Sequence, residues 1–272
     1  MRVCCVAIML CLFAVGCAKQ NRPHTRQTQV HIAADPPGVQ LHKAIEKGDL
    51  QGVTALLEKN PDPSLVNWRD KSGNYSPLDK AAYYGHVDIA KLLISRGAAV
   101  DSEDKNGNTS LWVAAMKGNT AVAALLIAHG ARVNGGDSAL TPLHAAVLNG
   151  HGKVAQLLIA KGANVNRAND LGSSPLHTAV TYNEHSIAAL LIAKGADVNA
   201  RDGDGFAPLH IAARGGFTEI AQMLLENGAE VNATGEHGET PMNMAGMGGD
   251  QMRALLESYG GQRGSVDYDL QL

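Results

Sequence analysis

The feature that most constrains the fold of this chain is a short module, of roughly 33 residues, that recurs along it. An apolar segment opens at nearly equal intervals, at Leu78, Leu111, Leu143, Leu176, Leu209 and Met242. Nineteen residues after each of the first five stands a Gly-Ala pair. Because so short a module cannot bury an apolar face alone, neighbouring copies must stack. The aromatic content of 4% agrees with many small stacked units rather than a core of large rings.

Each module is expected to contain two short helices. The first opens where a proline follows Ser, Thr or Ala, as an N-cap followed by proline at the first helical position, at Pro77, Pro142, Pro175, Pro208 and Pro241. It ends at a glycine suited to the left-handed cap, such as Gly85 or Gly118. The second helix carries a leucine pair and stops at the Gly-Ala pair. Polar turns such as 104–107 join the modules. We therefore predict an all-α solenoid of about seven helix-turn-helix units with connecting β-hairpin loops.

The modules resemble ankyrin repeats. The Thr-Pro-Leu-His signature of that family is complete at 141–144 and nearly complete at 174–177 and 207–210. The resemblance covers about residues 38–263, with the unit from Met242 onward as a C-terminal cap, and leaves 264–272 as a tail. It implies structural roles for the repeated histidines His144, His177 and His210, which would bond the backbone and the threonine region of the preceding unit rather than a metal.

The N-terminal segment 1–17 has the pattern of an export signal. Arg2 precedes an uncharged apolar run over 3–15, which is short for a membrane span because a spanning helix needs about 20 residues. The segment Leu12–Cys17 resembles the lipobox of bacterial lipoproteins. That resemblance implies a signal peptide over 1–16, a lipid on Cys17 and a flexible tether over 17–37. Cleavage by an ordinary signal peptidase, or an uncleaved anchor, are the alternatives.

The cysteines fit export with a lipid anchor. All four, Cys4, Cys5, Cys11 and Cys17, lie in the segment 1–17, so the exported chain would keep at most one and could form no disulfide framework. Ala18, next to the lipobox cysteine, is not the acidic residue that retains such proteins at the inner membrane. We therefore expect a lipid-anchored protein of the cell envelope, on the periplasmic side of the outer membrane.

Charge and motifs exclude several classes of function. The 23 basic and 26 acidic residues give a net charge of -3, which disfavours a nucleic-acid partner. The sequence contains no Gly-x-Ser-x-Gly elbow, no His-Glu-x-x-His pair and no phosphate-binding glycine loop with lysine. We therefore expect a monomer that is not an enzyme and needs no cofactor.

Recognition of another protein is the function that the resemblance implies. Ankyrin proteins bind partners mainly on the concave face, which is formed by the hairpin tips and the exposed side of the first helices. Offsets within the modules assign to this face eight large side chains of the kind that anchor interfaces: Tyr75, Tyr83, Tyr84, Met116, Leu140, Leu148, Tyr182 and Phe206.

A small-molecule or metal-binding protein of the envelope is the alternative from another class. Thioether sulfur is a soft ligand for Cu(I), and four methionines gather near the C-terminus: Met242, Met244, Met247 and Met252. Their spacing puts 242 and 244 on different sides of a helix, and Met242 occupies the core leucine position. Flexible core filler is the interpretation that the spacing favours.

Overall fold

A computed structural model of the chain describes residues 35–69, 75–136, 138–246 and 249–266. Those residues form seven pairs of α-helices and one 3₁₀ turn, η1 (Leu65–Asn67), and none of them lies in a strand. The first helices of the pairs are α1 (Pro37–Glu46), α3 (Pro77–Tyr84), α5 (Ser110–Lys117), α7 (Pro142–Leu148), α9 (Pro175–Thr181), α11 (Pro208–Gly215) and α13 (Pro241–Met244). The second helices are α2 (Leu50–Lys59), α4 (Val87–Ser95), α6 (Thr120–Ala128), α8 (Gly152–Ala160), α10 (His185–Ala193), α12 (Thr218–Glu226) and α14 (Gly249–Ser258).

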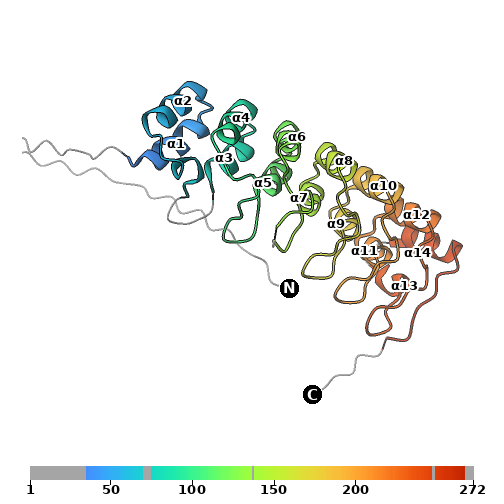
Figure 1. The fold of residues 1–272 in the computed structure, drawn as a ribbon. Helices are drawn as coiled ribbons and strands as arrows, with labels where there is room; N and C mark the ends of the chain where they lie inside the picture. The colour runs from blue at the N-terminus through green and yellow to red at the C-terminus, as the bar shows by residue number, and fades with distance from the viewer. Residues whose placement is uncertain (1–34, 70–74, 137, 247–248, 267–272) are drawn as a thin grey trace, which may run out of the picture. The chain divides into compact units, whose positions relative to one another are not determined.

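The helices from α1 to α14 stand in two rows (Figure 1). Each first helix packs on the first helix of the next unit, and each second helix does the same in its own row. The leucines that define the repeat are at most 1% exposed between the rows, and the alanines beside them, such as Ala145 and Ala146, are fully buried. Small side chains let adjacent first helices approach closely. The predicted all-α solenoid of stacked units is confirmed.

The helix ends follow the predicted chemistry. All five predicted prolines stand at the first position of their helix. α5 starts at the equivalent place without proline, because the Thr109 hydroxyl accepts from the Trp112 N–H at 3.3 Å. Gly85 and Gly118 end α3 and α5 with φ of 76° and 73°, a left-handed conformation that side chains disfavour.

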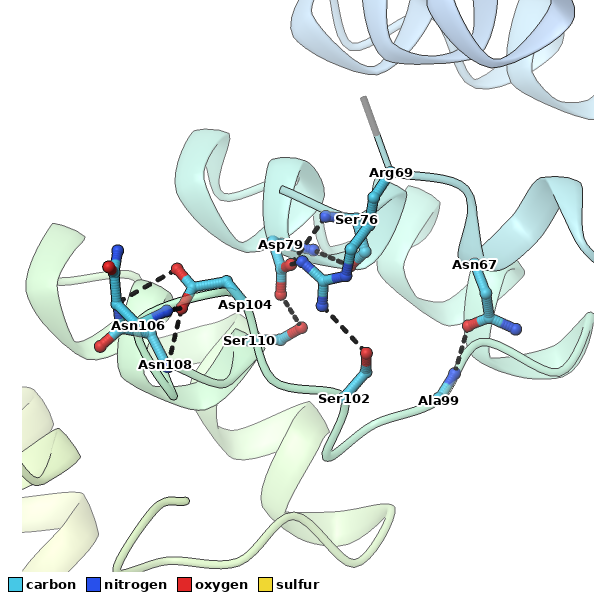
Figure 2. Close-up of polar contacts among 10 residues, drawn as sticks. All are labelled: Asn67, Arg69, Ser76, Asp79, Ala99, Ser102, Asp104, Asn106, Asn108 and Ser110. Carbon is cyan, nitrogen blue, oxygen red and sulfur yellow. Dashed lines mark hydrogen bonds and ion pairs between the residues drawn. The ribbon is translucent and has the colours of Figure 1, made fainter. Parts of the chain in front are cut away.

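The loops between units reverse direction as predicted, although the hairpins are reduced to tight turns. In three of them two backbone bonds close the loop. The N–H of Asp104, Asn169 and Asp202 donates to the carbonyl four residues later, and the carbonyl of the same residue accepts from the glycine N–H three residues later, all at 2.9–3.0 Å. The Asp104 carboxylate also accepts from the N–H groups of Asn106 and Asn108 at 2.7 and 2.9 Å (Figure 2). A strand ladder needs backbone pairs repeated along two strands, which bonds confined to one turn do not supply.

The signature histidines join each unit to the following one, not to the preceding one as the family resemblance implied. The Nε2–H groups of His144, His177 and His210 donate to the carbonyls of Ser173, Phe206 and Glu239 at 3.0–3.1 Å. Nδ1 of each ring faces the cap of its own helix; in His177 it accepts from the Ser174 N–H at 3.2 Å. Because carbonyls only accept, the proton of each ring stays on Nε2.

Asparagines after the second helices form another set of joints. The Asn166 Nδ2–H donates to the Gly195 carbonyl at 3.0 Å, and its Oδ1 accepts from the Asp197 N–H at 2.9 Å. Asn67, Asn199 and Asn232 make the same pair of bonds to the next unit. Each bond pair satisfies backbone groups left over at a helix end, so the joints hold successive units in register.

The two ends of the described chain close the stack. α1 begins at Pro37, and the Trp68 ring lies over Gly38. The Trp68 ring also meets the His42 ring edge-to-face, with the two ring centroids 4.9 Å apart. At the other end the Gly264 N–H donates to Asn243 Oδ1 at 2.8 Å, so the first residue of the expected tail is bonded to the last unit. None of the described helices is long and apolar enough to cross a membrane. The predicted signal, Cys17 and most of the tether lie outside the described residues.

Candidate functional site

Six of the eight residues predicted for the concave face form two groups in the structure. Tyr75, Tyr83 and Tyr84 meet at α3, and Leu140, Leu148 and Tyr182 meet around α7 and α9. Met116 and Phe206 join neither group. Six of the eight predicted residues therefore gather at two separate sites.

The tyrosine group, Tyr75, Tyr83 and Tyr84, is a set of edge-to-face rings. Tyr83 lies between the other two, with ring centroids 6.0 Å from Tyr75 and 5.0 Å from Tyr84. Tyr84 is 42% exposed and stacks on His86 at 6.0 Å. Burial raises the pKa of the Tyr75 phenol, with smaller opposing effects from Lys117 and Lys80. The Tyr75 phenol therefore stays protonated at neutral pH, and it can donate a hydrogen bond to a partner.

Two lysines lie over the tyrosine rings, and they differ in what else they contact. The Lys117 ammonium stands 4.1 Å from the Tyr83 ring centroid, within range of a cation–π contact. The Lys80 ammonium lies 5.6 Å from the Tyr75 centroid and also pairs with the Glu46 carboxylate at 2.6 Å. Among the described residues no carboxylate forms an ion pair with Lys117. Lys117 thus presents a positive charge that no carboxylate of the described residues neutralises through an ion pair.

A cleft of about 300 Å³ forms the second site, between α7, α9 and the loop before α9. Its apolar walls come from Leu140, Leu148, Leu171 and Tyr182, and the Thr181 hydroxyl is one of its polar groups. Tyr182 is 54% exposed and Leu171 is 74% exposed. Three of the eight predicted residues therefore share one apolar cleft.

Met116 and Phe206 are half-buried and pack against neighbouring residues of the stack. Met116 is half-buried against the core, and its carbonyl accepts from the His151 Nε2–H at 3.1 Å. The half-buried Phe206 ring lies against Gly235, where an added side chain would collide with it, and 5.4 Å from the His210 ring. Contact of either residue with a partner stays a prediction.

A buried polar network centres on Asp79 of α3, the helix that also carries Tyr83 and Tyr84 (Figure 2). The Asp79 carboxylate, 1% exposed, accepts from the Ser110 hydroxyl at 2.5 Å, the Ser76 N–H at 2.7 Å and the Arg69 guanidinium at 3.0 Å. Arg69 also donates to the Ser102 hydroxyl at 2.9 Å. Burial raises the pKa of Asp79, and the donors oppose that rise. Because Ser110 is also buried, its hydroxyl cannot reach a substrate, and the pair is a structural joint.

The methionines near the C-terminus are mainly core residues. Met242 and Met252 are buried in the core, at 5% and 0% exposure, and Met244 packs against it. Met247 lies outside the described residues. Across the described ranges, no group of three or more His, Cys, Asp or Glu could hold a metal ion.

Sequence reasoning missed two residues that shape the sites. Leu171 stands at a loop tip where other modules carry Asn106, Asp204 or His237, so an apolar residue in a polar position was the available signal. Lys117 occupies the same offset as Tyr84 and Tyr182, and its placement over the Tyr83 ring depends on how α3 packs on α5.

Comparison with known families identifies the repeats. A profile described as ankyrin repeats in three copies matches residues 81–169, 134–202, 163–235 and 185–267. A second, described as ankyrin repeats in many copies, matches 41–94. Together they cover most of the chain.

Curated relatives share only a segment with this chain. The 2-5A-dependent ribonuclease of Mus musculus is 39% identical over 77 residues, which are 28% of this chain and 10% of the relative. The probable E3 ubiquitin-protein ligase XBOS32 of Oryza sativa subsp. japonica is 38% identical over 81 residues, 30% of this chain and 16% of the relative. The chain thus spans a small part of their length.

Solved structures match over most of this chain. The ankyrin repeat domain of human ASB11 has a TM-score of 0.73 and 27% identity, covering 82% of this chain and 98% of that one. The ankyrin repeat domain of Bcl-3, described as a unique member of the IkappaB protein family, has a TM-score of 0.72 and 26% identity, covering 82% and 99%.

Proposed function

Because the chain belongs to the ankyrin repeat family, we propose that it binds another protein through its concave face while a lipid on Cys17 holds it at a bacterial envelope. Ankyrin repeats are protein-binding scaffolds, and the proposal narrows that role to one face and one location. The protein acts as a monomer, catalyses no reaction and requires no cofactor. It serves as a scaffold, an inhibitor or an immunity-like protein.

The observation that carries the binding proposal is the exposure of large side chains on this face. Tyr84 and Tyr182 are about half exposed, and Leu171 is more exposed still. Aromatic residues of this kind are the usual anchors of protein interfaces, because they bury a large area with few rotatable bonds. Exposed apolar groups that gather around a cleft are more informative than single exposed leucines.

Site-specific photocrosslinking in cells tests the binding face. A benzophenone amino acid at position 84 or 182 is expected to capture the same partner, whereas one at Leu50, 40% exposed on α2, is not. Tyr84→Ala and Tyr182→Ala are each expected to weaken binding of that partner about fivefold or more, since losing an aromatic anchor typically costs more than about 1 kcal/mol. Equal capture at Leu50 would remove the concave face from the proposal.

The envelope location is proposed from the N-terminal segment 1–18. A short apolar run ending in Cys17, followed by Ala18, supports export, lipid attachment and the periplasmic side of the outer membrane. Several acyl chains on one terminus exceed the two signals needed for stable membrane attachment. Multiple acylation would therefore keep the protein on the membrane.

Mass spectrometry of the mature N-terminus tests the anchor. The expected product begins at Cys17 and carries acyl chains, and the Cys17→Ser variant is expected to lose the lipid and move to the soluble fraction. A product with Met1 intact and no lipid would show an uncleaved anchor. Cleavage at another residue, also without lipid, would show an ordinary signal peptide.

A further inference from the structure

Resting on the proposed binding role of the concave face, we infer that this face recognises an extended peptide segment of its partner. The segment carries an apolar side chain that enters the cleft between α7 and α9, and an acidic side chain that meets Lys117. The two side chains stand roughly four to six residues apart in the partner's sequence. Two observations lead to this chemistry, the apolar cleft and the cation without a described partner, and the stacking of the helices gives their approximate spacing.

The cleft determines the apolar residue. Its volume of about 300 Å³ is at the lower end for ligand sites, so it suits one side chain rather than a folded element. Leu140, Leu148 and Leu171 supply three aliphatic walls, and Tyr182 supplies an aromatic one. Leu171 is 74% exposed, so a partner leucine, isoleucine or phenylalanine in the cleft would cover it.

Lys117 determines the acidic residue. Its ammonium lies 4.1 Å from the Tyr83 ring centroid, which fixes its position, and no described carboxylate pairs with it. Lys80, the other lysine of the tyrosine group, is paired with Glu46 at 2.6 Å and offers less unsatisfied charge. Glutamate or aspartate on a partner complements Lys117, and the neighbouring phenols can add hydrogen bonds to the carboxylate.

The spacing follows from the stack. Lys117, on α5, has the same offset in its unit as Asn149 at the end of α7 and Tyr182 at the end of α9. Adjacent packed helices lie about 8–10 Å apart, so the cleft between α7 and α9 is roughly 12–15 Å from α5 at Lys117. The Lys117 ammonium lies over the ring of Tyr83 from α3, which adds to that distance. An extended chain advances about 3.3 Å per residue, which gives roughly four to six residues between the two contacts.

Selection from a phage-displayed library of random peptides on the full chain tests this chemistry. Enriched peptides are expected to share an apolar and an acidic position at roughly that spacing. In fluorescence anisotropy, Leu171→Asn is expected to weaken a synthetic consensus peptide about tenfold, and Lys117→Glu about tenfold or more. Asparagine stands at the equivalent tip position, 106, of another unit, so Leu171→Asn should leave the fold intact.

A charge reversal and two matched controls make the test specific. A repeat selection on Lys117→Glu is expected to enrich a basic residue at the formerly acidic position. Leu50→Asn on α2 and Lys161→Glu after α8 remove an exposed leucine and an exposed lysine from the other row of helices, and neither should alter binding.

Three results would overturn the inference. They are no enriched peptide, a consensus without the two positions, or binding that neither Leu171→Asn nor Lys117→Glu changes. Suppose that one of these results is found, but the partner captured by crosslinking still binds more weakly to Tyr84→Ala or Tyr182→Ala. The concave face then keeps its proposed function, and the peptide chemistry alone is wrong. If the tyrosine variants also have no effect, the proposed binding face is wrong as well.

Discussion

Replacing Asp79 with alanine is expected to lower the free energy of unfolding by about 3–5 kcal/mol, the range for removing one partner of a buried ion pair. The change leaves the Ser76 N–H and the Ser110 hydroxyl without their acceptor in a buried position, and it removes the carboxylate that faces Arg69. Urea unfolding followed by circular dichroism measures the loss. Asp88→Ala, an exposed carboxylate on α4, serves as the control and should change stability by about 0.5 kcal/mol or less.

A double-mutant cycle separates this joint from a general loss of packing. Asp79 stands where other units carry histidine, and Ser110 stands where the following unit carries proline. Asp79→His removes the acceptor of the Ser110 hydroxyl, and Ser110→Pro removes a donor to the carboxylate. The double variant combines histidine and proline as the other units do. Its loss in the free energy of unfolding should therefore be smaller than the sum of the two single-variant losses by about 1–2 kcal/mol. Additive losses would contradict the account of the joint.

Acidification from pH 7 to pH 5 is expected to destabilise the fold strongly. Burial lowers the pKa of His144, His177 and His210 below that of an exposed histidine, about 6.5. As the pH falls below about 6.5, the unfolded chain binds protons that the folded chain excludes, so stability falls with pH. Each ring contributes at most about 1.4 kcal/mol per pH unit, and the three together at most about 4.

The contribution of one histidine to the pH dependence can be measured by replacing it with the residue that another unit carries at the same position. In the last unit Asn243 stands at the histidine position, where its Oδ1 accepts from the Thr240 N–H at 3.0 Å. His177→Asn is therefore expected to fold. The number of protons taken up on unfolding, which sets how steeply the free energy of unfolding depends on pH, should fall by up to about one. Asp79 acts in the opposite sense at lower pH, because its raised pKa favours the folded state as the pH falls through the range between its unfolded and folded values. Equal stability at pH 7 and pH 5 would contradict the histidine prediction.

The repeat was predictable because local chemistry and periodicity agree in most of the units. Proline at the helix start, glycine at its end and leucines between them favour the same helices whatever the neighbours are. The direction of the histidine bonds was not predictable in this way. His177 and the Phe206 carbonyl are 29 residues apart, and the sequence does not say which neighbouring unit faces the ring.

The candidate site was predictable in part, because offsets select a face without fixing exposure. The same rule places Tyr182 in a cleft and turns Phe206 against Gly235, a position where most other loops carry the Asp or Asn that closes the turn. Only glycine leaves room there for the ring. Likewise, the Asp79 joint depends on Arg69 and Ser110, which lie 10 and 31 residues away and meet only when units two and three pack.

The carboxylate joint also means that the modules are not interchangeable building blocks. If the second module were copied and inserted before the fifth, its aspartate would face Pro175, which has no hydroxyl to donate, and the arginine that balances the charge would have to move with it. A rearranged or lengthened array must therefore carry both sides of that junction together. Shuffling whole units at other boundaries, where histidine meets a backbone carbonyl, sets no such condition on side-chain identity.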